Sequence, residues 1–237
     1  GPELAQIIRC NDDWLRIPII YLSAETDIGK QMNALIKAGD DFVTKPISDN
    51  ALVATVFSRA QRARLLSNAL ARDSLTGLLK HGDIKEQVAI ELERTLRSGD
   101  RASVVMLDID HFKRVNDEHG HAAGDNVIRA LANLLRQRLR RVDSLGRYGG
   151  EEFLAVLPDC NPQQAKQIVD EIRERFAELR FIADGGEFSC TLSAGIAGTD
   201  VNSDAEQLRE RADKALYAAK HSGRNQVQIA ASEEHRG

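Results

Sequence analysis

Hydrophobic and polar residues follow two spacings along this chain, one typical of buried strands and one typical of amphipathic helices. In the first 50 residues, apolar runs predict two short strands, at 17–22 and 41–44. Helical spacing predicts two helices, one over 4–15 and one that ends before Gly39. Asp49 is expected to cap a longer helix over 51–72, which contains neither proline nor glycine.

From residue 73 onward, strands and helices alternate more densely. We expect helices over 84–96, 125–140, 165–179 and 208–221, and strands over 103–107, 144–148, 153–157 and 227–229. Residues 188–197 are expected to form a strand pair or one long strand. The run 103–107 is almost continuously apolar, as expected for a strand covered on both faces. This alternation predicts an α/β or α+β fold. The expected division is a partial α/β segment at 1–50, a connecting helix at 51–72, a main domain at 73–230 and a tail at 231–237.

Composition narrows the class of protein. The 237 residues can bury a substantial core, and a net charge of −4 argues against nucleic-acid binding through a basic surface. No apolar run approaches the roughly 20 residues that a membrane span needs, and no signal peptide is visible, so no membrane partner is expected. Cys10, Cys160 and Cys190 lack metal-ligand spacing. We therefore expect reduced thiols and a cytoplasmic location.

The helix expected at 51–72 has two interpretations. Its apolar positions fit a short coiled-coil seam formed by Val56, Ala63, Leu66 and Leu70. Arg59 interrupts that seam, and neighbouring arginines are equally consistent with a connector that has a solvated basic face. The residues alone leave both a dimerising helix and a plain connector open.

Three acidic residues are candidates for chemistry. Asp108 follows a buried strand, and Glu151 and Glu152 follow Gly149-Gly150 between two predicted strands. If that hairpin pairs beside the first strand, the carboxylates converge at one end of a sheet and form an oxygen site suited to Mg²⁺ or Mn²⁺. Such a cluster suits metal-assisted phosphoryl transfer. An ordinary hairpin turn with solvated glutamates explains the same spacing.

Several motifs resemble those of one family. Residues 147–153 read RYGGEEF, which is similar to the signature of the GGDEF-domain diguanylate cyclases. Four further segments resemble that family's DxLTGL, DIDxFKxxND, GHxxGD and ADxALYxAK motifs, at 73–78, 108–117, 120–125 and 212–220. The motifs stand in the family's order over about 160 residues. One departure is Lys80-His81, where the family commonly has Asn-Arg.

The resemblance implies a fold and a metal site. The fold would have a central mixed or antiparallel sheet flanked by helices, similar to nucleotidyl cyclases and polymerase palms. Asp108 and the backbone carbonyl of Ile109 would hold divalent metal, with two Mg²⁺ or Mn²⁺ ions per active site. Glu151 would be the catalytic carboxylate, as a base or as a metal ligand, and Glu152 a metal ligand or a supporting carboxylate.

The resemblance also implies how GTP would bind. Asn116 and Asp125 would read the guanine edge, because Asp accepts from N1–H and the amino group while Asn both donates and accepts. His121 would lie near the nucleoside. The groups expected around the triphosphate are the backbone of Phe112 and the side chains of Lys113, Lys220 and Arg224.

The implied reaction condenses two GTP into cyclic di-GMP and two pyrophosphates. One domain would hold one GTP, so two active sites must face each other in a homodimer. The helix at 51–72 would raise the local concentration of the two domains. The alternatives are a catalytically silent cyclic di-GMP sensor and a receiver-driven dimerisation module.

Residues 140–143 read RRVD, and their spacing from the signature resembles the family's inhibitory RxxD site. Arg140 and Asp143 would then bind the product, cyclic di-GMP, as an inhibitor. Without the resemblance, the arginines are explained by their place at a helix C-terminus. Some members add an arginine on the next helix, where this chain has Glu171 with Arg173 nearby.

The first 50 residues resemble the last strands of a response-regulator receiver domain. The resemblance rests on IPIIYLS at 17–23 and FVTKP at 42–46. Ser23 would be the switch hydroxyl and Lys45 the phosphate-binding lysine. The acceptor aspartate and the acidic pair would lie before residue 1, and a histidine kinase would act on the full-length protein. A partial receiver would also expose apolar sheet surface.

Overall fold

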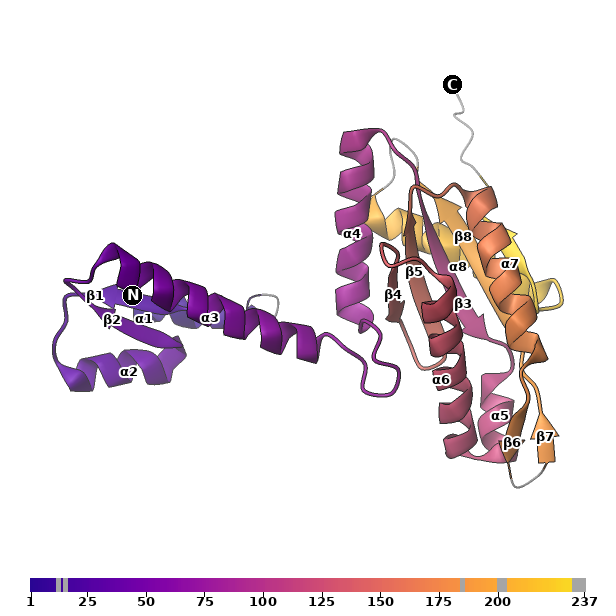
Figure 1. The fold of residues 1–237 in the computed structure, drawn as a ribbon, viewed down its shortest axis with the longest axis horizontal. Helices are drawn as coiled ribbons and strands as arrows, with labels where there is room; N and C mark the ends of the chain where they lie inside the picture. Colours follow the sequence, from indigo (N-terminus) through magenta and orange to yellow (C-terminus); the bar gives the residue numbers. More distant parts are fainter. Residues whose placement is uncertain (12–13, 15–16, 184–185, 200–203, 232–237) are drawn as a thin grey trace. The chain divides into compact units, whose positions relative to one another are not determined.

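The computed structural model describes residues 1–11, 14, 17–183, 186–199 and 204–231, and gives the backbone alone for 66–70. The chain divides into two compact units, Gly1–Ala71 and Arg72–Gly237 (Figure 1). The finer division expected from the sequence, with a separate connecting helix at 51–72, stays a prediction.

The first unit is built around two parallel strands. Its elements are α1 (Pro2–Arg9), β1 (Ile20–Ser23), α2 (Ile28–Ala38), β2 (Asp41–Thr44) and α3 (Asp49–Leu70). β1 and β2 pair in register from Ile20 opposite Asp41 to Ser23 opposite Thr44, and α2 is the crossover that a parallel pair requires. The predicted helix over 4–15 is present only up to Arg9, and 12–13 and 15–16 lie outside the described residues.

The start of α3 differs from the sequence prediction. Asp49 is the first helical residue rather than the cap. The preceding residue, Ser48, accepts a hydrogen bond at its Oγ from the Ala51 N–H at 3.4 Å. The prediction was wrong because both residues are good caps, and only the backbone shows which of them stands outside the helix.

The predicted seam on α3 is described only in part. Val56 is exposed, Ala63 is half-buried, and the side chains of Leu66 and Leu70 lie outside the described residues. Arg59 is held by its own unit, because its Nε lies 2.8 Å from Asp41 Oδ2. The dimerising seam therefore stays a prediction.

The second unit has a mixed five-stranded sheet between two layers of helices (Figure 1). Its helices are α4 (His81–Ser98), α5 (Phe112–His119), α6 (His121–Arg138), α7 (Pro162–Glu178) and α8 (Ala205–His221). Its strands are β3 (Ala102–Ile109), β4 (Ser144–Arg147), β5 (Glu152–Pro158), β6 (Phe181–Ala183), β7 (Gly186–Phe188), β8 (Leu192–Gly198) and β9 (Val227–Ile229). The sheet order is β4-β5-β3-β8-β9, antiparallel except for the β8–β9 pair.

The central strand β3 separates two hydrophobic cores. Val105, Leu107 and Ile109 pack on the face covered by α6 and α7. Val104 and Met106 pack on the opposite face, covered by α4 and α8. Every residue of β3 is buried, as predicted from its continuous apolar run, and Asp108 is therefore held at the end of a rigid strand.

Two local predictions were incomplete. Residues 188–197, expected as a strand pair or one long strand, belong to two strands in two sheets, since β7 pairs with β6 in a separate hairpin while β8 pairs with β3. Helix α5 was not predicted as a separate element, because eight residues are too few to show a clear period. Among the described residues, no helix is long and apolar enough to cross a bilayer.

Candidate functional site

The acidic turn lies at the end of the central sheet, beside the last residues of β3. The antiparallel register of β3 and β5 places Asp108 directly opposite Glu152. Residues opposite each other in such a pair have Cα atoms roughly 4.5–5.5 Å apart. Glu151 precedes Glu152 in the turn. The sheet therefore sets two of the three acidic residues singled out from the sequence opposite each other, with Glu151 next to them in the turn.

Asp108 is a buried carboxylate with a lysine partner. Its Oδ2 lies 2.8 Å from Lys220 Nζ on α8, and its side chain is 7% exposed. The pKa of Asp108 is raised to about 6, mainly by burial and to a smaller extent by the negative charges of Glu151 and Glu152, against the opposing effect of the Lys220 hydrogen bond and charge. Lysine and burial thus compete over the charge of this carboxyl group.

The donor set fits a hard divalent cation, although it is not a closed cage. Within the described residues, no three or more His, Cys, Asp or Glu side chains stand close enough to hold an ion. Asp108 nevertheless combines burial with repulsion from two glutamates, and a bound divalent cation would relieve both. Carboxylate and carbonyl oxygens are ligands suited to Mg²⁺ and Mn²⁺.

Asp110 organises the loops around this strand end, a role that sequence analysis missed. It is 4% exposed and accepts hydrogen bonds from Thr191 Oγ1 and Ser193 Oγ, both at 2.7 Å, and from Asn225 N–H at 3.0 Å. The last bond ties the Arg224-Asn225 loop to the residue that follows β3. Asp110 stood in the DIDxFK motif, but only the fold shows that its carboxylate is buried and bonded to these loops.

The signature turn is also anchored from the start of the second unit. Arg147 donates to the Gly150 carbonyl from Nη2 at 2.7 Å and from Nε at 3.0 Å. Its Nη1 lies 3.2 Å from Asp73 Oδ2. Burial tends to raise the pKa of Asp73, but hydrogen bonds from Thr76 and the charge of Arg147 outweigh it, so the pKa is lowered. The opening motif and the signature motif are therefore one structural unit.

A second contact reaches the turn from α4. His81 Nδ1 lies 2.8 Å from the Tyr148 carbonyl oxygen, and the two rings pack with their centroids 4.2 Å apart. Arg209, which is ion-paired with Glu206, places its guanidinium carbon 5.6 Å from the centroid of the Tyr148 ring. His81 occupies one of the two positions at which the sequence departs from the common family pattern.

The residues expected to read guanine come from two packed helices. Asn116 lies on α5, and His121 and Asp125 lie exposed on the first two turns of α6. A Cβ atom at Gly124 would stand 2.0 Å from Asn116 Oδ1, so glycine allows this amide to lie against α6. The structure therefore places Asn116 close to the helical turn that carries Asp125.

The residues expected around the triphosphate differ in their surroundings. Lys220 is already bonded to Asp108, and Arg224 lies exposed in the loop held by Asp110. Lys113 is exposed on the first turn of α5, whereas the Phe112 side chain is buried in the core. The Phe112 side chain is thus part of the core, and the role of its backbone toward a ligand stays a prediction.

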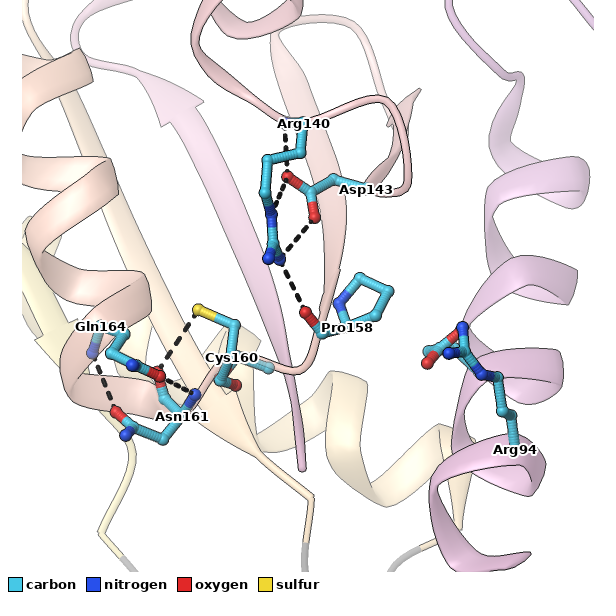
Figure 2. Close-up of polar contacts among 9 residues, drawn as sticks. Arg94, Arg140, Asp143, Pro158, Cys160, Asn161 and Gln164 are labelled. Carbon is cyan, nitrogen blue, oxygen red and sulfur yellow. Dashed lines mark hydrogen bonds and ion pairs between the residues drawn. The ribbon is translucent and has the colours of Figure 1, made fainter. Parts of the chain in front are cut away.

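Arg140 and Asp143 lie at the opposite end of β5 from Glu152 (Figure 2). Asp143, with a side chain only 1% exposed, accepts from Arg140 Nη2 at 2.9 Å and from the Arg140 backbone N–H at 2.7 Å. Arg140 also donates to the Pro158 carbonyl at 2.6 Å. The hydrogen bond with Asp143 raises the pKa of Arg140. The arginine is thereby held in one orientation while about half of its side chain stays exposed.

Arg173 and Arg94 bond to residues other than Arg140 and Asp143. Arg173, close to the helix position where some family members add an arginine, bonds to Asp170 and to Asn225 Oδ1, each at 3.0 Å. It is therefore directed toward the Asn225 loop. Figure 2 shows Arg94 of α4 on the Pro158 side, and its Nη1 lies 3.6 Å from Glu91.

In the first unit, Ser23 and Lys45 lie at neighbouring strand ends. The Lys45 N–H donates to the Ser23 carbonyl at 2.8 Å, and the Ser23 hydroxyl accepts from the Glu25 N–H at 3.2 Å. The parallel pairing of β1 with β2 brings the two residues together. The apolar residues Ile28, Met32 and Ile36 are exposed at four-residue intervals along α2.

The fold and this site define a mixed α/β domain that carries an acidic hairpin turn at one end of its central sheet. Residues 70–226 match the family model described as "Diguanylate cyclase, GGDEF domain". That match covers well over half of the chain, and the chain belongs to this family.

Individual relatives agree with that assignment. The chain is 42% identical over 158 residues to the diguanylate cyclase DgcP of Pseudomonas aeruginosa, a match that covers 67% of this chain and 24% of DgcP. It is 34% identical over 240 residues to the response regulator PleD of Caulobacter vibrioides, covering 96% of this chain and 53% of PleD. The chain thus spans about half, or less than half, of the length of these relatives.

A solved structure supports the same fold. The coiled coil and GGDEF domain of DgcB from Caulobacter crescentus, in complex with c-di-GMP, superposes with a TM-score of 0.68 at 28% identity. The match covers 76% of this chain and 98% of that one. This likeness confirms the predicted central mixed sheet flanked by helices.

Proposed function

We propose that this protein is an active diguanylate cyclase that condenses two GTP molecules into cyclic di-GMP and two pyrophosphates. The observation that carries the proposal is the register that sets Asp108 opposite Glu152 in a chain whose signature retains both glutamates. A silent sensor would not need these carboxylates to be kept together.

The residues divide the work by position. Asn116 and Asp125 bind the guanine edge, and His121 lies near the nucleoside. Lys113, Lys220 and Arg224, with the backbone of Phe112, bind the triphosphate. The 3′-hydroxyl of one nucleotide attacks the α-phosphorus of the other, a new P–O bond forms, and the bond to the departing pyrophosphate breaks. Glu151 accepts the hydroxyl proton or binds metal.

Asp108, the Ile109 carbonyl, Glu151 and Glu152 are the proposed ligands for two Mg²⁺ or Mn²⁺ ions. When bound, the metal lowers the pKa of the attacking hydroxyl and neutralises the phosphate charge. Lys220 contacts Asp108 at 2.8 Å, so it would bind a phosphate once Asp108 served as a metal ligand.

Catalysis requires a homodimer, because one domain supplies one GTP site. We assign α3 to this task, as a helix that raises the local concentration of the two domains. The similar DgcB structure comprises a coiled coil and a GGDEF domain, which supports this assignment.

Product inhibition is proposed at Arg140 and Asp143. The half-exposed guanidinium, held in place by Asp143 and the Pro158 carbonyl, is preorganised for a guanine edge or a phosphate. The similar DgcB structure was solved with c-di-GMP. In this arrangement Asp143 mainly orients Arg140, because its own side chain is almost fully buried.

The first unit is proposed to be the second half of a receiver domain. The support is the match to the response regulator PleD over 96% of the chain, together with the juxtaposition of Ser23 and Lys45. A histidine kinase would then act on the receiver of the full-length protein.

The test is to incubate the purified chain with GTP and Mg²⁺ and to analyse the products by chromatography and mass spectrometry. Cyclic di-GMP that appears only with a divalent metal, at a specific activity that rises with protein concentration, supports the proposal. Tight binding of cyclic di-GMP without any turnover of GTP would contradict the proposal and indicate a catalytically silent sensor.

A further inference from the structure

We propose that His81 is a positioning residue for the signature turn, and this inference rests on the proposed cyclase activity. His81 is the first residue of α4, and its ring contacts Tyr148, which immediately precedes Gly149-Gly150. The proposed role is to hold the Tyr148 carbonyl, and through it the backbone that carries Glu151 and Glu152.

The hydrogen bond defines the protonation of one ring nitrogen. A carbonyl oxygen only accepts, so His81 Nδ1 must carry a proton to bond to the Tyr148 oxygen at 2.8 Å. The imidazole therefore acts as a donor here in both its neutral and its charged form. Ring packing at 4.2 Å adds a second contact between the same two residues.

His81 is attached to a rigid part of the domain. Ile84 of α4 is fully buried, and a Cβ atom at Gly146 of β4 would stand only 2.5 Å from the Ile84 Cβ. The Leu79 N–H donates to the Leu145 carbonyl at 3.2 Å, and the Arg147 N–H donates to the Leu79 carbonyl at 2.8 Å. The beginning of α4 is thus fastened to β4 on both sides of Gly146.

The turn is the part that needs such a tether. Two successive glycines have more backbone freedom than any other pair of residues, and a contact from outside the turn limits it. The Tyr148 N–H donates to the Glu152 carbonyl at 2.8 Å, so moving Tyr148 also moves Glu152. The Glu152 carboxylate lies back over the turn, since a Cβ atom at Gly149 would stand 2.5 Å from Glu152 Oε2. A loose Tyr148 therefore misplaces the carboxylates opposite Asp108.

Three substitutions separate the donor from the ring. His81→Phe keeps a ring and removes the donor, His81→Asn keeps an N–H near the Nδ1 position and removes the ring, and His81→Ala removes both. We expect His81→Phe and His81→Ala to lower kcat about tenfold with KM for GTP changed less than about twofold, because small misplacements of reacting groups affect the transition state most. His81→Asn should stay within about threefold of the wild type.

The chain offers a matched control at His221. Its Nδ1 lies 3.0 Å from the Tyr217 carbonyl and its ring stacks on Tyr217 at 3.9 Å, so it makes the same two contacts at the end of α8. The same three substitutions at His221 should leave kcat unchanged. Equal losses at both histidines would mean a general effect on stability and would overturn the positioning role, as would full activity of His81→Phe.

A second measurement separates this inference from the cyclase proposal. Hydrogen exchange followed by mass spectrometry reports the opening of residues 148–152 whether or not GTP is turned over. Faster exchange there in His81→Phe and His81→Ala, but not in His81→Asn, supports the tether even if the wild type makes no cyclic di-GMP. Identical exchange in all four proteins overturns it.

Discussion

At each end of strand β5, a buried aspartate is paired with a basic residue. The two ends differ in how far the partners offset the burial of the aspartate charge. At the Glu152 end, Asp108 has Lys220 as its partner, and burial and two nearby glutamates still raise its pKa to about 6. At the Pro158 end, Asp143 accepts from the Arg140 backbone and from two guanidinium nitrogens. Arg140 is held by the Pro158 carbonyl as well.

This difference means that Asp108 can exchange Lys220 for another cation, whereas the hydrogen bonds of Asp143 are already complete. Burial destabilises the charged form of Asp108, and its partners offset this cost only in part. A bound divalent cation would stabilise the charged form, as expected for a metal ligand. A carboxylate with three donors gains little from a ligand of its own and instead fixes its arginine. The comparison assigns chemistry to the first end and preorganised recognition to the second.

The largest expected effect is on turnover. Glu151→Gln should lower kcat by about 10³-fold, because it removes a carboxylate needed as a base or as a metal ligand. Steady-state assays with GTP and Mg²⁺ measure this, with the exposed Glu178→Gln on α7 as the control. Near-normal activity of Glu151→Gln would contradict the proposal that the Glu152 end of β5 is the catalytic site.

The next effect concerns the charge of Asp108 in protein freed of metal with EDTA. A carboxyl whose pKa rises from 3.8 to about 6 on folding stabilises the protein while protonated, and that stability is lost as pH rises through about 6. The free energy of unfolding should thus fall by up to about 3 kcal/mol between pH 4 and pH 7.5. Asp108→Asn should abolish this fall in urea titrations and be the more stable protein at pH 7.5.

Mg²⁺ provides the control for that experiment. It should restore the stability of the wild type at pH 7.5 and have little effect on Asp108→Asn, because the ion binds the charged carboxylate. If Asp108→Asn is less stable than the wild type at pH 7.5 in EDTA, then the ion pair with Lys220 offsets the cost of burying the Asp108 charge, and the prediction is wrong.

The third effect tests recognition at the other end. Arg140→Ala should raise the cyclic di-GMP concentration needed for half-inhibition by at least about tenfold, since it removes charge-assisted hydrogen bonds, while kcat changes little. Arg141→Ala, which changes the neighbouring exposed arginine, is the matched control. An unaltered inhibition curve for Arg140→Ala would leave this end without a regulatory role.

The smallest effect has the opposite sign to that of Asp108→Asn. Asp143→Asn should lower the free energy of unfolding at pH 7.5 by about 1 kcal/mol, because it weakens a satisfied ion pair whose arginine is half exposed. The same urea titrations measure it. If both asparagine variants shift stability in the same direction, the two ends do not differ as argued.

The sequence predicted elements whose signal is local. The apolar run of β3, the bounds of β2 and β9, and the glycine turn before Glu151 all followed from neighbouring residues. Predictions failed where neighbours compete, as when Ser48 rather than Asp49 caps α3. They stayed open where partner strands decide, as at 188–197, where the pattern fitted a strand pair or one long strand and the structure has two strands in two sheets.

By itself, the sequence determined the family, the class of fold and the acidic residues of the candidate site, because motifs and hydrophobic periods are written in consecutive positions. Only the tertiary structure showed that Asp108 faces Glu152, that Lys220 reaches Asp108, and that His81 bonds to Tyr148. These contacts join residues far apart in the chain. Their geometry comes from strand pairing and helix packing, which depend on the whole domain and not on local propensity.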